Sequence, residues 1–215
     1  IYCFGIKSFK DMNNISKTTR EFLNEISVIP RLEVSEMQES KDGTIKWLIK
    51  LNDGSEIETV YIPQDDRGTV CLSSQVGCTL NCSFCHTGTQ ALVRNLKSSE
   101  IIGQLMLVMD HLHDWPSGKS NRKVTNIVMM GMGEPLLNYE EVSKAIKVML
   151  SDDGISLSRR RITLSTSGII PLIEKAGIDL GVNLAISLHA VNDNLRNQLV
   201  PINKKYNLII KGLFF

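Results

Sequence analysis

Three cysteines crowd into one short stretch of the sequence, GCTLNCSFCHTG at residues 77–88. Cys78, Cys82 and Cys85 follow a C-x-x-x-C-x-x-C spacing, and His86 comes directly after the third cysteine. Thiolates bind zinc and iron–sulfur clusters, whereas buried structural cysteines normally scatter with the core. The surrounding glycines and small polar residues are typical of a loop. The spacing therefore predicts a metal centre held by three thiolates.

Two kinds of metal fit such a triplet. On a four-iron cluster, three thiolates would leave one iron open for a substrate or cofactor. Zinc prefers four nitrogen or sulfur ligands, so a zinc site would need His86 or His189 as the fourth. Zinc fingers usually add a second C-x-x-C pair or a distant Cys/His pair, and the sequence has no second pair. We therefore favour the cluster, and we interpret His86 as a neighbour of the site.

Further groups that suit such a centre follow three other β-rich runs. In parallel α/β folds the ligand lies at the carboxyl ends of the strands, so these groups would share one rim with the cysteines. Glycines at this rim would let a backbone carbonyl reach an ammonium group of a ligand. Taken alone, however, the GMGEP motif favours a tight turn, and the serines are equally typical of helix caps. The groups are Gly131, Gly133 and Glu134 of GMGEP, then Ser165, Thr166 and Ser167, and finally Ser187, Leu188 and His189.

The elements that would position these groups change character along the chain. Residues 7–29 predict one or two short polar helices, and residues 32–62 predict a small antiparallel sheet with turns at KDG and NDG. From residue 67 onward, strand and helix patterns alternate four times, which is typical of a parallel sheet of βαβ units. We expect Ser98 or Ser99 to cap the first helix of this part and Gly177 to end the third. We expect an accessory region at 1–66 and a core at 67–215.

The composition narrows the class of protein. The 215 residues are 42% hydrophobic and 22% charged, with a formal net charge of +1, which indicates an ordinary globular core. We find no apolar run near the ~20 residues that a membrane helix needs and no secretory signal pattern. Five cysteines, three of them crowded, do not form a disulfide framework. We expect a cytoplasmic protein that is not associated with a membrane.

Longer motifs resemble one family. The cysteine triplet and the following GxGE-type turn resemble the radical S-adenosylmethionine (radical SAM) superfamily. Within it, the chain is similar to the dual-specificity methyltransferases that modify C2 of adenine in 23S rRNA and tRNA. The resemblance rests on ETVYIP, VCLSSQVGCTLNCSFC, NIVMMGMGEPLLN, RRRITLSTSGIIP, LAISLHA and VPINKKYN.

The resemblance implies a fold and two cofactors. The fold would be α/β, an incomplete radical SAM (β/α) partial barrel with about four of six βα units and a small N-terminal α+β region. Cys78, Cys82 and Cys85 would hold a [4Fe-4S] cluster that, with S-adenosylmethionine, yields a 5′-deoxyadenosyl radical. The residues that match the family's S-adenosylmethionine-binding positions are Gly133, Glu134, Ser165, Ser187, Leu188 and His189.

The resemblance also implies roles for two residues outside these loops. In the family, the radical takes hydrogen from a methyl group carried on a C-terminal cysteine, and a second cysteine helps to break the protein–RNA adduct. Cys71 matches that second cysteine, and Glu58 matches the proton acceptor. The implied partners are 23S rRNA, tRNA and a flavodoxin-type electron donor.

One part of the family pattern is absent from the sequence. No cysteine follows Cys85, and the chain begins with Ile1 rather than Met. We therefore expect a chain truncated at the C-terminus and at the N-terminus, without the methyl-carrying cysteine and unable to methylate RNA by itself. The competing functions are a non-catalytic RNA-binding module and a zinc-stabilised structural protein.

Overall fold

The computed structural model describes residues 1–208, and a single mixed sheet of seven strands forms its centre. The strand order is β1-β2-β3-β4-β7-β8-β9. The strands are β1 (Glu33–Glu39), β2 (Ile45–Lys50), β3 (Glu56–Gln64), β4 (Arg67–Cys71), β7 (Asn126–Met129), β8 (Ile162–Thr166) and β9 (Asn183–Ile186). The α-helices are α1 (Lys17–Ile26), α2 (Ser98–His111), α3 (Tyr139–Leu150), α4 (Ile170–Leu180) and α5 (Asp193–Leu199).

Strands β1 to β4 form the antiparallel half of the sheet. The predicted KDG and NDG turns lie between β1 and β2 and between β2 and β3. Gly43 and Gly54 adopt φ values of +81° and +83° there, which a glycine reaches without a steric cost. The two hairpin turns therefore lie where the sequence predicted them.

Strands β4, β7, β8 and β9 are parallel and form the other half. Helices α2, α3 and α4 connect them in turn, and α5 follows β9, which gives the four predicted βα units. Strand β4 pairs with β3 on one side and β7 on the other, so the two halves form one continuous sheet. The predicted domain boundary falls in the turn between β3 and β4 and remains a prediction.

The two faces of the sheet differ in what covers them. One face packs against α2, α3 and α4 in the main core, where Val70, Ile127 and Leu164 are almost fully buried. Strand alternation turns the residues between them to the opposite face, which is only half-buried in the described part of the chain. The register Val60–Cys71–Val128–Thr163 runs across this second face, which we call the open face.

Two helix limits differ from the predictions. Helix α2 begins at Ser98 with Lys97 as the N-cap residue, and the Glu100 carboxylate accepts from the Lys97 N–H at 2.8 Å, so neither serine is the cap. Helix α4 continues through Gly177 and ends at Gly181, which takes the left-handed conformation with φ +60°. A glycine inside a helix lowers stability slightly without ending it when packing supports the next turn.

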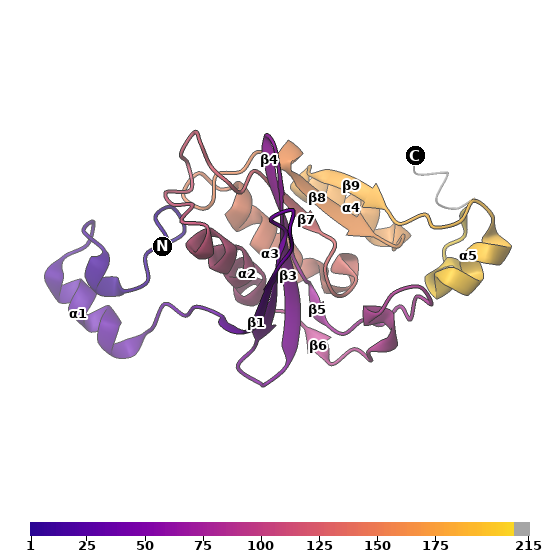
Figure 1. The fold of residues 1–215 in the computed structure, drawn as a ribbon, viewed down its shortest axis with the longest axis horizontal. Helices are drawn as coiled ribbons and strands as arrows, with labels where there is room; N and C mark the ends of the chain where they lie inside the picture. Colours follow the sequence, from indigo (N-terminus) through magenta and orange to yellow (C-terminus); the bar gives the residue numbers. More distant parts are fainter. Residues whose placement is uncertain (209–215) are drawn as a thin grey trace.

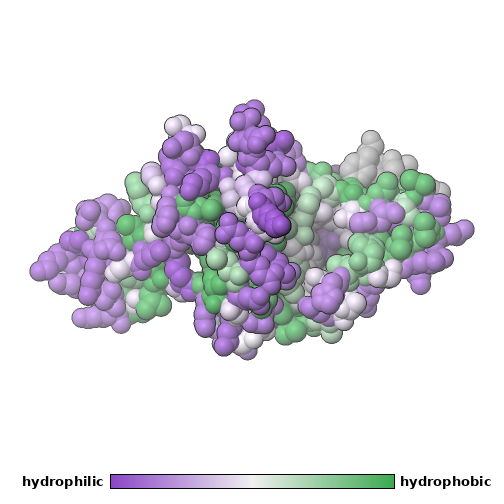
Figure 2. Space-filling view, in the orientation of Figure 1, coloured by the Kyte–Doolittle hydropathy of each residue, from purple (hydrophilic) through white to green (hydrophobic). Residues whose placement is uncertain are grey.

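Helices α1 and α5 lie at opposite ends of the long axis (Figure 1). The surface over α1 is mainly hydrophilic, whereas hydrophobic residues gather on the surface around α5 (Figure 2). Helix α1 buries none of its residues, and the Ser16 side chain caps it, as predicted, by accepting from the Thr19 N–H. None of the described helices has the length and apolar character required to cross a membrane.

Candidate functional site

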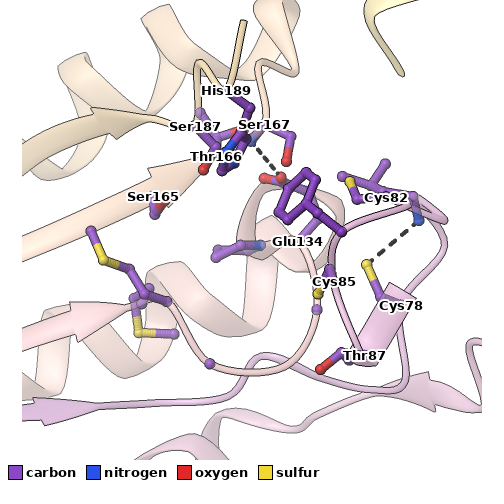
Figure 3. A pocket seen from close by; sticks show the side chains of 17 residues that line it. Cys78, Cys82, Cys85, Thr87, Glu134, Ser165, Thr166, Ser167, Ser187 and His189 are labelled. Atoms are coloured by element: carbon purple, nitrogen blue, oxygen red, sulfur yellow. Dashed lines mark hydrogen bonds between the residues drawn. The ribbon is translucent and has the colours of Figure 1, made fainter. Parts of the chain in front are cut away.

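A pocket opens where the parallel strands end, and most of the predicted site residues line it. The cysteine loop forms one wall, the loops after β8 and β9 form the other, and Glu134 lies between them (Figure 3). The predicted residues that line the pocket are Cys78, Cys82, Cys85, Gly131, Gly133, Glu134, Ser165, Thr166, Ser167, Ser187 and His189. Four separate segments therefore meet where the parallel strands end, as the rule for ligand sites in parallel folds predicts.

The cysteine loop carries no long helix or strand and is held by backbone bonds and apolar contacts. The Cys85 N–H donates to the Cys82 carbonyl at 3.1 Å, and the Leu80 N–H donates to the Cys78 Sγ at 3.5 Å. Burial raises the pKa of Cys82 to about 11, and the neighbouring cysteines add to this. The Cys82 thiol therefore stays protonated at neutral pH, and a metal that binds there would have to replace the proton.

The three thiols do not converge on one point. Among residues 1–208, no three His, Cys, Asp or Glu side chains are arranged to hold a single metal ion. A zinc ion would draw its ligand atoms to within about 2.3 Å of one centre. On an iron–sulfur cluster each thiolate binds a different iron, so the thiolates stand further apart. Three thiolates that line one pocket are a donor set that fits an iron–sulfur cluster.

Glu134 is the buried charge at the centre of the pocket, only 3% exposed. Its carboxylate accepts from the Ser167 N–H at 2.8 Å and from the Leu136 N–H at 3.2 Å. Burial raises its pKa above the ordinary value. No described lysine, arginine or histidine forms an ion pair with it. A buried carboxylate without a basic partner is suited to bind a cationic group from outside.

Gly133 brings the backbone close to a neighbouring loop. Its φ is +94°, and a Cβ on this residue would overlap the Cβ of Gln75. The Glu134 N–H, the next along the chain, donates to the Gln75 side-chain oxygen at 2.9 Å. The glycine in GMGEP is therefore required by both conformation and space, as the tight turn predicted.

Leu188 and His189 behave differently, although they are adjacent. His189 lines the pocket and packs against Phe84 with ring centroids 4.1 Å apart, whereas Leu188 does not line it and is 45% exposed. Ser187 and His189 therefore face the pocket while Leu188 does not, although all three follow the end of β9 at Ile186. His86 does not line the pocket, in agreement with its interpretation as a neighbour.

Glu58 and Cys71 lie outside the pocket, on the open face. Cys71 is opposite Val60, two residues from Glu58 on the adjacent strand, so both side chains point to the same side. Glu58 forms an ion pair with Lys46 at 3.1 Å. Burial raises the pKa of Cys71 to about 11. The same face continues to Ser165, so these residues and the pocket border one surface.

Three residues of the site were missed by the sequence reasoning. Phe84 lies inside the cysteine motif, and its aromatic ring between two thiols was the signal available. Gln75 and Arg196 are nearly or fully buried and bind the strand-end loops through hydrogen bonds. Neither stands out locally in the sequence, because their partners are distant along the chain.

Comparison with known proteins agrees with this geometry. The family model of the radical SAM superfamily matches residues 72–211. The chain is 56% identical over 208 residues to the "Dual-specificity RNA methyltransferase RlmN" of Zymomonas mobilis, covering 97% of this chain and 53% of the relative. It is 56% identical over 215 residues to the protein of the same name from Bradyrhizobium sp. strain ORS 278, covering 96% and 53%.

A solved structure is similar as well. A radical SAM methyltransferase from Sphaerobacter thermophilus superposes with a TM-score of 0.85 at 40% identity, covering 94% of this chain and 59% of that one. The chain thus spans about half the length of the curated relatives it matches. The superfamily implies a [4Fe-4S] cluster and S-adenosylmethionine as cofactors. On the family match, the fold and the cysteine pocket together, the chain belongs to the radical SAM superfamily.

Proposed function

We propose that this chain is the cluster- and S-adenosylmethionine-binding part of an enzyme that methylates C2 of adenine in 23S rRNA and tRNA. The names of its relatives support the RNA methyltransferase class. The enzyme would act in the cytoplasm with a flavodoxin-type electron donor. The observation that carries the proposal is the single pocket that collects three cysteines and the groups after β7, β8 and β9.

The cysteine wall would hold the cluster. Cys78, Cys82 and Cys85 would each bind one iron, which would leave the fourth iron without a thiolate and free to bind the cofactor. When bound there, the cluster and S-adenosylmethionine supply the 5′-deoxyadenosyl radical. The buried position of Cys82, 8% exposed, would keep water away from the metal.

The opposite wall would orient S-adenosylmethionine. Glu134 would accept hydrogen bonds from the ammonium group, which supplies the missing positive partner. The hydroxyls of Ser165 and Ser187 and the ring of His189 point to the same space. Gly133 allows the close backbone approach. Leu188, matched by the family, would contribute through its backbone, because its side chain does not line the pocket.

Two groups on the open face would move protons. Cys71 keeps its proton at neutral pH because burial raises its pKa to about 11, so its thiol needs a base before it can act as a nucleophile. Glu58, which pairs with Lys46, is the proposed proton acceptor. Because both side chains lie on the same face, an RNA bound over that face could contact both of them and reach the pocket.

Cofactor loading and S-adenosylmethionine cleavage test the proposal. The chain is reconstituted with iron and sulfide, reduced with dithionite and incubated with S-adenosylmethionine. We expect iron and sulfide in the protein and formation of 5′-deoxyadenosine, and we expect neither property in Cys82→Ala. One equivalent of zinc, or an iron-loaded chain that forms no 5′-deoxyadenosine, would contradict the proposal in favour of a structural or purely RNA-binding role.

A further inference from the structure

Arg196 is an unusual residue for the interior of this fold. It lies on α5, is fully buried, and donates four hydrogen bonds to neutral oxygens. Its Nε donates to the Leu188 carbonyl at 2.8 Å, and one terminal nitrogen donates to the Ser187 and Ser167 carbonyls at 2.8 and 2.9 Å. Its other terminal nitrogen donates to the Asn203 Oδ1 at 2.6 Å. Burying a cation is costly, so its directed hydrogen bonds to neutral oxygens, together with the electrostatic attraction of the Asp193 carboxylate, must compensate.

The backbone acceptors of Arg196 lie on two separate strand ends. Ser167 follows β8, whereas Ser187 and Leu188 follow β9. Ser167 and Ser187 both line the pocket. One terminal nitrogen of Arg196 therefore bridges the two loops that form the strand-end wall, while its Nε holds Leu188 and its other terminal nitrogen holds Asn203. The single ammonium nitrogen of a lysine cannot hold all four acceptors in this planar arrangement.

The same bonds hold the backbone beside His189. This residue has φ +59°, a left-handed conformation that residues other than glycine adopt rarely. The Leu188 carbonyl, on the peptide that precedes it, accepts from Arg196 and from the Ala190 N–H at 2.7 Å. Such a conformation persists only where neighbouring contacts determine it. The hydrogen bond from Arg196 to the Leu188 carbonyl is such a contact, so Arg196 helps to direct the His189 ring into the pocket.

Helix α5 also contacts the cysteine wall. The Ser83 N–H donates to the Leu199 carbonyl at 3.1 Å. Leu80, Cys82 and Val200 form a small apolar cluster at the end of the same helix. Helix α5 thus links the cysteine loop to the two strand-end loops, and Arg196 makes the link on the strand-end side.

We propose that Arg196 is a positioning residue for the S-adenosylmethionine side of the pocket. It holds the Ser167, Ser187 and Leu188 carbonyls so that Ser187 and His189 face the cysteine loop. It does not touch the cofactor itself. The inference rests on the proposed function, because it assigns the pocket to S-adenosylmethionine.

The test compares S-adenosylmethionine affinity in the full 215-residue chain after reconstitution with iron and sulfide. In Arg196→Lys we expect the dissociation constant to rise about tenfold or more, since hydrogen bonds from a charged donor are lost. We expect the iron content per chain to stay unchanged, which a general folding defect would not allow. Arg122→Lys is the matched control, because Arg122 also donates to two backbone carbonyls, of Ile155 and Ser156, and does not line the pocket.

The outcomes separate the two claims. If the unsubstituted chain binds the cluster but no S-adenosylmethionine, the proposed function fails and this inference fails with it. If it binds S-adenosylmethionine and Arg196→Lys binds equally well, only the positioning role is overturned. If Arg196→Lys does not fold, Asn203→Ala decides, because it keeps the arginine and removes the acceptor of one terminal nitrogen, together with the bonds that Asn203 donates to Asp193 and Asn197. There we expect about threefold weaker binding, and an unchanged constant overturns the inference.

Discussion

The two walls of the pocket are built in different ways. The cysteine wall is a loop with local backbone bonds and a small apolar cluster around Leu80 and Cys82. The strand-end wall is fixed by two buried charged side chains, Glu134 and Arg196, which bind backbone groups of neighbouring loops. The first wall thus gathers the three proposed metal ligands from one short motif. The second depends on contacts between segments far apart in the sequence.

The cysteine wall makes the strongest prediction. Cys82→Ala removes one of three proposed iron ligands, so we expect iron per chain after reconstitution to fall by at least about tenfold, down to background, since even the loss of a group that only supports a metal ligand commonly lowers metal affinity by that much. Iron and sulfide analysis measures this. Cys3→Ala is the control, since Cys3 does not line the pocket and donates to the Asp153 carbonyl instead. Equal iron content in both variants would show that the triplet is not the metal site.

Gly133→Ala tests how tightly the strand-end side is packed. The added Cβ would be strained at φ +94° and would overlap Gln75, so we expect a loss of about 1–3 kcal/mol in the free energy of unfolding. Gly177→Ala, in a helix with open space around it, should instead gain about 0.5–1 kcal/mol. Urea denaturation of the metal-free chain measures both. If the free energy of unfolding changed in the same direction in both variants, the close approach of Gly133 to Gln75 would be refuted.

Glu134→Gln tests the buried charge on the strand-end side. The substitution keeps the size of the side chain and removes the negative charge that faces the pocket. We expect about tenfold weaker S-adenosylmethionine binding, the effect of losing one charge-assisted hydrogen bond. Equilibrium dialysis measures the change. Glu174→Gln, at an exposed position on α4, should bind as the unsubstituted chain does. Unchanged affinity in Glu134→Gln would assign the carboxylate a purely structural role.

The smallest expected effect is a pH dependence. Burial raises the pKa of Cys71 to about 11, above the value of about 8.5 in an unfolded chain. The folded state therefore favours the protonated thiol. Its contribution to stability is fully present below about pH 8.5 and is lost as the pH rises toward 11. We expect the free energy of unfolding of the metal-free chain to fall over this range, and less steeply in Cys71→Ala. Parallel curves for the two proteins would contradict the burial of this thiol.

The sequence predicted the parts of the site that depend on local pattern. The cysteine spacing, the GMGEP turn and the serines after β8 and β9 could be assigned because strand alternation and the rule for strand ends place them together. Arg196 and Gln75 could not, because their hydrogen-bond partners lie in other segments. The end of α4 was misplaced for a related reason, since tertiary packing carries the helix past Gly177 to Gly181.

The central claim is that both walls form one site around one cofactor pair. The most direct measurement is the electron paramagnetic resonance spectrum of the reduced, reconstituted chain, recorded with and without S-adenosylmethionine. The account predicts a cluster signal that changes when S-adenosylmethionine is added, because the three cysteines that would hold the cluster line the same pocket as Glu134, Ser187 and His189. A cluster signal that stays the same at saturating S-adenosylmethionine would contradict it.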